Sequence, residues 1–146
     1  MQEIKAKISL ETALKNIEEI KENLYGKNIL DLLQNDDTKK EVEKVKPGNF
    51  LKAAVVGGLV YYDTEQKSLV QKLINPIESG EQKCDTLYYK NRLTLEILRD
   101  EDTSNDIAHA INLVTRLTGR SKQIIGKIYG QDLSIMQDIC AFFYVS

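Results

Sequence analysis

Two short runs in the middle of this chain, residues 69–74 and 83–89, have the pattern of extended strands and flank a polar turn that contains Ser79 and Gly80. Such a pair of runs around a glycine-containing turn is typical of an antiparallel β-hairpin. The segments on either side differ, because their apolar residues recur every three or four positions, as on one face of a helix. The sequence therefore predicts an α+β fold that is predominantly α-helical, with a helical N-terminal part, a central β-hairpin and a C-terminal helical cluster.

The N-terminal part contains one clear helical stripe. Residues 3–8 alternate charged with apolar side chains, which favours a short strand, and the pattern changes at Ser9. Gly26 is well placed to end the helix that follows. The apolar stripe of this helix comprises Leu10, Ala13, Leu14, Ile17, Ile20 and Leu24. Asn28 can cap a second short helix, and Thr38 with Glu41 has the spacing of a capping box.

The segment 49–63 allows two interpretations. Its small residues Ala53, Ala54, Gly57 and Gly58 would let a helix pack closely against a neighbour, although adjacent glycines weaken a helix by about 1 kcal/mol each relative to alanine. We favour a helix, with a buried strand pair as the alternative.

The last third of the chain reads as a series of helices. One begins within residues 93–98, and a second is capped by Ser104 or Asn105 and ends at Gly119. Ser121 and Asp132 can cap two more, with Gly130 between them. We expect the apolar faces of these helices to share a core. Its predicted members are Leu113, Leu117, Ile124, Ile128, Leu133 and Met136.

Length and charge narrow the class of protein. A chain of 146 residues fits a single domain, 1–146; a division into a helical part, 1–66, and a hairpin-plus-helices part, 67–146, stays open. The net charge is −2, and acidic and basic residues alternate, which argues against a nucleic-acid or anionic-membrane binder. The N-terminus has no apolar signal region and the apolar run 53–62 is too short to span a bilayer, so we expect a cytoplasmic protein.

Few residues offer catalytic chemistry. His109 is the single histidine, which excludes a histidine-based metal cluster, and Cys84 and Cys140 read as buried free thiols. The glycine pair in VVGGLV lacks the lysine and hydroxyl of a phosphate-binding loop. We therefore predict no enzyme, no catalytic or metal site and no cofactor. An enzyme that uses carboxylates not identifiable from sequence remains a minor alternative.

A group of basic residues carries the rival functional hypothesis. Arg116, Arg120, Lys122 and Lys127 gather around one helix turn and could contact phosphates. The alternative function is therefore a small helical regulator that binds nucleic acid through residues 116–127.

The second half of the chain, about residues 69–146, resembles the phage tail assembly chaperones. The resemblance rests on the order LVQKLINPIESGEQKCDTLYYKNRLTLEIL, then INLVTRLTGRSKQIIGKI, then GQDLSIMQDICAFF. The pieces closest to the family pattern are 117–119, 132–137 and the pair Phe142 and Phe143. The first 60 or so residues depart from the short family members, which often begin near the hairpin.

The resemblance implies a non-enzymatic chaperone that coats the tape measure protein, a long helix-forming protein, before the tail tube forms around it. The implied partners are the tape measure protein and, as a further candidate, the tail tube protein, with self-association also open. A phage or prophage protein of this kind would act in the host cytoplasm.

Such a chaperone needs apolar side chains that a partner helix can reach. We expect these at the aromatic C-terminus, in Ile139, Phe142, Phe143 and Tyr144, with Leu59, Tyr61 and Tyr62 as the second choice. The competing interpretation is that the same aromatic residues close the core.

Overall fold

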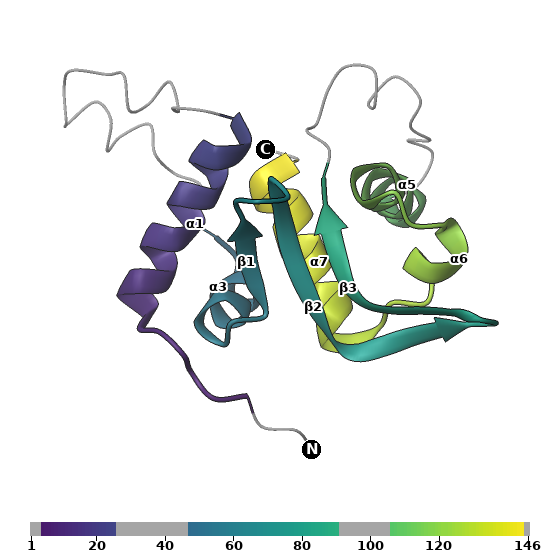
Figure 1. The fold of residues 1–146 in the computed structure, drawn as a ribbon, viewed down its shortest axis with the longest axis horizontal. Helices are drawn as coiled ribbons and strands as arrows, with labels where there is room; N and C mark the ends of the chain where they lie inside the picture. The colour runs from purple at the N-terminus through teal and green to yellow at the C-terminus, as the bar shows by residue number, and fades with distance from the viewer. Residues whose placement is uncertain (1–3, 26–46, 91–105, 145–146) are drawn as a thin grey trace.

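A long strand, β2 (Ser68–Ser79), runs through the centre of the computed structural model, which describes residues 4–25, 47–90 and 106–144 (Figure 1). It pairs on one side with β1 (Val60–Asp63) and on the other with β3 (Gln82–Tyr89), both antiparallel. Ser79 pairs with Gln82, and Gly80 adopts a φ of 63° in the turn between them, which glycine accepts at little cost. The predicted hairpin is therefore confirmed, and β1 extends it to three strands.

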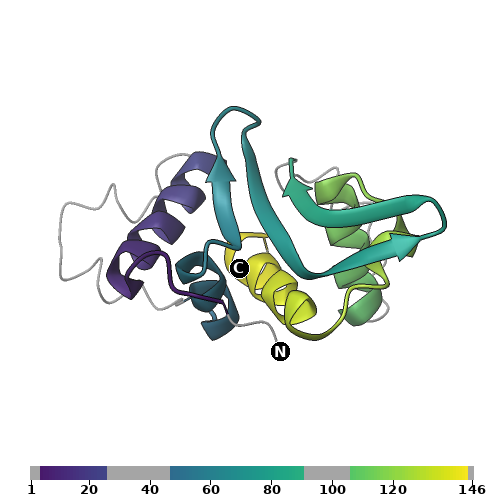
Figure 2. The ribbon, with the colours of Figure 1, turned by 60° about the horizontal axis from the view of Figure 1, so that its bottom comes forward.

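The hairpin is bent by an irregularity in β2. Lys72 pairs with Thr86 and Ile77 pairs with Cys84, so residues 73–76 bulge out of the ladder. Pro76, which has no N–H to donate, lies in this bulge. Figure 2 shows the outer part of the hairpin turning sharply away from the inner part. The bulge thus gives the sheet two faces at different angles for helices to pack on.

Helices lie at both ends of the sheet, and one crosses it. α1 (Leu10–Tyr25) and α3 (Asn49–Val56) lie near β1, while α5 (Asp106–Thr118) and α6 (Lys122–Ile125) lie beside β3 and the outer hairpin (Figure 1). α7 (Gly130–Ile139) runs between these groups and continues into a π-helical turn, η2 (Cys140–Tyr144). The α+β class with helices before and after a central hairpin agrees with the prediction.

Local signals fix several helix ends, and those at Gly119 and Ser121 were predicted. The backbone N–H of Thr12 donates to the Ser9 hydroxyl at 3.1 Å, so Ser9 caps α1. α5 ends before Gly119, and the Ser121 hydroxyl accepts from the N–H of Ile124 at the start of α6. The predicted features at Asn28, Thr38 with Glu41, residues 93–98 and Ser104 or Asn105 lie outside the described residues.

Two local predictions are wrong, and a third is right only in part. Residues 4–8 form no strand; they are an arm whose Lys7 N–H donates to the Val56 carbonyl at 2.9 Å. The helix favoured in segment 49–63 is present from Asn49, but it ends at Val56, and after Gly57 and Gly58 the chain becomes β1. A glycine pair ends a helix readily because glycine is less stable in the helical conformation than most other residues. Asp132 does not cap α7, because its carboxylate is directed at β2.

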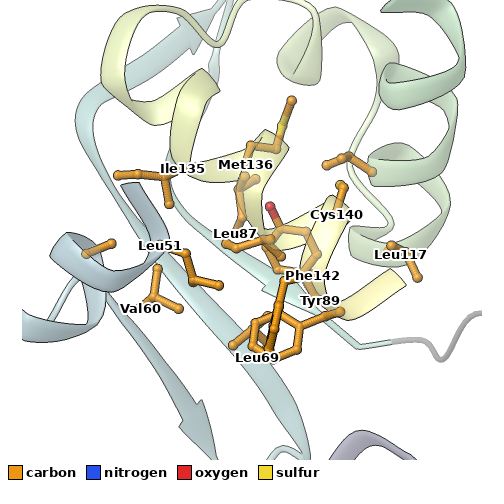
Figure 3. Packing of buried hydrophobic residues seen from close by; sticks show 14 of the residues in the cluster. Leu51, Val60, Leu69, Leu87, Tyr89, Leu117, Ile135, Met136, Cys140 and Phe142 are labelled. Carbon is orange, nitrogen blue, oxygen red and sulfur yellow. The ribbon is translucent and has the colours of Figure 1, made fainter. Parts of the chain in front are cut away.

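The core is one cluster that draws on every layer, from Ala13 in α1 to Phe143 in η2. In Figure 3, Leu51 of α3, Leu69 of β2 and Leu117 of α5 appear among its members. The predicted C-terminal core is confirmed. The sixth predicted residue, Leu133, is half-buried and packs against the cluster. The other five are buried: Leu113, Leu117, Ile124, Ile128 and Met136.

Replacing Leu117 with alanine tests this core. Its side chain is fully buried, so Leu117→Ala should lower the free energy of unfolding by about 2 to 5 kcal/mol through lost burial and the cavity left behind. Chemical denaturation with circular dichroism measures the change, and an exposed position such as Leu10→Ala serves as the control. An unchanged denaturation midpoint for Leu117→Ala would show that α5 is placed wrongly.

Candidate functional site

An open apolar groove of about 270 Å³ lies between the N-terminal arm, α3, the β2 bulge and the start of α7. Ile4 and Ala6 form the wall on the arm, and Phe50 and Ala53 belong to the α3 side. At its mouth two large apolar side chains remain unusually accessible, Ile4 at 45% and Phe50 at 44%. The groove is therefore apolar inside and apolar at its edge.

The depth of the groove comes from small residues on one face of α3. Phe50, Ala53, Ala54 and Gly57 follow one another at helical spacing and all line the groove. A Cβ at Gly57 would lie 2.7 Å from Cγ2 of Ile4, so only glycine lets the arm approach this closely. Small side chains along α3 thus leave the space that larger ones would fill.

The floor of the groove is held by a carboxylate of α7. Ile74 lines the groove from the β2 bulge, and its backbone N–H donates to Oδ1 of Asp132 at 2.7 Å. The N–H of Asn75 donates to Oδ2 of the same carboxylate at 2.8 Å. The side chain of Asp132 is only 1% exposed. Its two oxygens thus satisfy backbone donors that the bulge removes from the ladder.

A buried polar chain extends this anchor into the sheet. The side-chain amide of Gln71 donates to the backbone carbonyl of Asp132 at 3.1 Å, and the Tyr89 hydroxyl donates to Oε1 of Gln71 at 2.8 Å. Gln71 and Tyr89 are both fully buried, on β2 and β3. The start of α7 is therefore tied to both strands of the hairpin.

A second carboxylate of α7 holds α3. Oδ2 of Asp138 accepts the backbone N–H of Leu51 in the first turn of α3 at 3.1 Å, a favourable place for a negative charge. Any Cβ on Gly48, which precedes this helix, would collide with the Asp138 carboxylate. Gln131 and Ile135 of α7 also line the groove. One helix therefore supplies part of the floor and, through Asp132 and Asp138, holds the β2 bulge and α3 in place.

The predicted partner-binding residues at the C-terminus lie elsewhere. Ile139, Phe142 and Phe143 are buried in the core, so the expectation that they are accessible at the surface is wrong. Phe142 packs edge-to-face on Phe143, and Nζ of Lys21 in α1 lies 4.6 Å from its ring centre. The aromatic end of the chain therefore closes the core, and the Tyr144 side chain lies outside the described residues.

The second-choice residues are nearer the candidate site. Leu59 lines the groove, while Tyr61 is exposed and Tyr62 is half-buried on β1. Seven binding residues were predicted, and the side chain of Tyr144 is not described. Of the other six, only Leu59 borders the groove. Sequence reasoning missed the other groove residues, of which Ile4 and Phe50 are the two large exposed ones. The repeat of small residues after Phe50 was a usable signal, since it marked a helix face shaped for close approach.

Other sequence predictions can be located too. Cys84 and Cys140 are buried and lie outside any disulfide, as predicted. Arg116, Lys122 and Lys127 are exposed and Arg120 is half-buried, near the end of α5 and along α6. Within the described ranges no group of three or more His, Cys, Asp or Glu residues could hold a metal ion, and no helix is long and apolar enough to cross a membrane. The His109 side chain lies outside the described residues.

Comparison of the chain with protein-family models, with curated proteins and with solved structures finds no match. The candidate site therefore rests on its own geometry.

Removing one acceptor from Asp132 tests whether it anchors the groove. Asp132→Asn replaces one carboxylate oxygen with an amide group that cannot accept a backbone N–H, which leaves a buried donor unpaired. We expect the free energy of unfolding to fall by about 1 to 3 kcal/mol at neutral pH. Urea denaturation measures this, with the exposed Asp85→Asn as the matched control. Equal effects of the two substitutions would contradict the anchoring role.

Proposed function

We propose that this protein is a non-enzymatic chaperone for assembly of a phage or prophage tail, and that it binds the tape measure protein. The observation that carries the proposal is the apolar groove, with Ile4 and Phe50 accessible at its mouth. An exposed apolar patch with polar residues around it is one mark of a protein-interaction site. The resemblance of residues 69–146 to tail assembly chaperones supplies the identity of the partner.

The shape of the groove supports recognition of side chains from a protein segment. Its volume of about 270 Å³ is below the usual range of roughly 300 to 1,000 Å³ for small-molecule pockets, and its walls are mostly apolar. An amphipathic helix binds such a groove by inserting the few side chains of its apolar stripe. A long helix-forming client would present this stripe many times, so weak individual contacts would add up along its length.

Co-expression tests the proposal. Tagged wild-type protein, produced together with fragments that tile the tape measure protein encoded beside it, should retain at least one fragment through affinity purification. The matched control is the same fragment with the leucines and isoleucines of its apolar stripe changed to serine, which should no longer be retained.

The rival function predicts a different result. Binding of nucleic acid through residues 116–127 would give retention on immobilised DNA that falls steeply with salt and is weakened by Lys122→Glu. Salt-dependent DNA retention, together with failure to retain any tape measure fragment, would overturn the chaperone proposal.

A further inference from the structure

The face of the sheet that points away from the core carries a row of two tyrosines and a valine. α7 lies behind the inner strands in Figure 1 and below them in Figure 2, on the core side of the sheet. Tyr61 of β1 pairs with Val70 of β2, and Val70 pairs with Tyr88 of β3, so the three side chains share one face. Tyr62, the next residue on β1, packs against the core cluster, whereas the buried Val70 does not belong to it. The row therefore lies on the opposite face from the core.

A lysine lies beside each of the two tyrosine rings. Nζ of Lys72 is 5.6 Å from the ring centre of Tyr61, and Nζ of Lys90 is 5.9 Å from that of Tyr88. Both lysines are exposed, Tyr61 is 40% exposed and Tyr88 is half-buried. A ligand on this face could therefore reach two aromatic rings and two ammonium groups.

One acidic side chain shares this face of the sheet. Asp63 lies two positions after Tyr61 on β1, and successive side chains of a strand alternate between its faces. Oδ1 of Asp63 accepts the backbone N–H groups of Glu65 and Gln66 at 3.0 and 3.2 Å, so its charge holds the turn that follows β1. The two exposed lysines therefore set the charge that a ligand would meet across the rings.

We infer that this face, formed by Tyr61, Val70 and Tyr88 with Lys72 and Lys90, binds single-stranded nucleic acid. Each nucleotide presents one flat base and one negative phosphate, and each tyrosine–lysine pair offers one ring and one ammonium group. Bases stack on aromatic rings with little regard to sequence, and lysines neutralise phosphates. Two strand spacings, about 10 Å, separate the two tyrosines, which leaves room for a separate base on each ring. An acidic protein segment would satisfy the lysines alone.

This inference does not depend on the proposed function, and it concerns a different surface from residues 116–127. The net charge of −2 gives the whole chain no long-range attraction for a polyanion. The contacts on this face must therefore supply the affinity. We expect binding that tolerates any sequence and is strongest at low salt.

Fluorescence anisotropy with labelled oligo(dT) of about 15 nucleotides tests the inference on the full-length protein. At about 0.05 M salt the single strand should bind at least about tenfold more tightly than a duplex of the same length, whose bases are not free to stack on the rings. The logarithm of the binding constant should fall with the logarithm of the salt concentration with a slope of about −1.4, because each of two phosphate contacts contributes about −0.7. Four basic residues at 116–127 would give a slope of about −2.8.

Variants of the protein separate stacking from charge. Tyr61→Ala should weaken binding of the single strand about fivefold or more, whereas Tyr61→Phe keeps the ring and should stay within about twofold of wild type. Lys72→Glu with Lys90→Glu should also weaken binding about fivefold or more. Neither of two matched controls should change it: Tyr129→Ala, at a tyrosine that is 57% exposed just before α7, and Lys122→Glu on α6. Circular dichroism confirms that each variant is folded.

Several outcomes would overturn the inference. These are no binding of the single strand at low salt, equal binding of single strand and duplex, and unchanged binding by folded Tyr61→Ala. Loss of binding in Lys122→Glu, with none in the Lys72 and Lys90 double variant, would move the site to residues 116–127. Oligo(rU) should bind as oligo(dT) does, because rings and ammonium groups do not read the 2′-hydroxyl. A difference of more than about tenfold between the two would also overturn the inference.

The same variants separate this inference from the proposed function. If Tyr61→Ala abolishes retention of a tape measure fragment and wild type binds no oligonucleotide, the face binds protein; the inference then fails and the proposed function stands. Oligonucleotide binding as expected, with no fragment retained, upholds the inference and overturns the tail chaperone.

Discussion

The two hydrogen bonds from the β2 bulge to the Asp132 carboxylate are the interaction on which the rest of the structure depends. A bulge in a central strand leaves backbone N–H groups without partners, and burying them unpaired would cost several kcal/mol. Asp132 satisfies two of them at 2.7 and 2.8 Å, and ionised acceptors make such bonds stronger than neutral ones. The bent hairpin and the start of α7 therefore require each other, and neither is stable in this form alone.

α7 extends this dependence to the other side of the groove. Asp138, on the same helix, holds the first turn of α3 through the N–H of Leu51. Ile135 lies between the two carboxylates along the helix and lines the groove. One short helix thus sets the position of α3 relative to the bulge, and with it the width of the groove. A substitution at Asp132 would therefore also alter the width of the groove.

Local signals in the sequence were sufficient for the elements but not for this arrangement. The hairpin, the Ser121 cap and the end of α5 depend on neighbouring residues, so the pattern predicted them. The role of Asp132 could not be predicted, because a carboxylate at a helix start normally caps its own helix. Its true partners lie almost sixty residues earlier in the chain. β1 was missed for a related reason, since its four residues form a strand only against β2.

Burial of the apolar chain end was equally beyond local reasoning. An aromatic cluster such as Phe142 and Phe143 has the same pattern whether it binds a partner or closes a core. The tertiary packing decides the question here, since both rings belong to the core cluster and Lys21 of α1 lies over the Phe142 ring. Phe50 is the converse case. Its position at the start of an apolar helix is typical of a core residue, but the small side chains that follow it leave space on that face of the helix, and Phe50 borders this space.

The groove combines a firmly held floor with a lightly held wall. Hydrogen bonds that the Asp132 and Asp138 carboxylates accept from backbone N–H groups fix the bulge and α3, and both anchors are at least half-buried. The arm, in contrast, is joined to α3 by the Lys7 N–H and the contact of Ile4 with Gly57, and most of its residues are exposed. Moving the arm would therefore disturb fewer interactions than moving α3 or α7. A surface built in this way can accept apolar side chains of different sizes by displacing one wall, while its floor keeps the orientation of the partner. That division would suit the proposed tail chaperone, whose proposed client would offer many similar but unequal apolar segments.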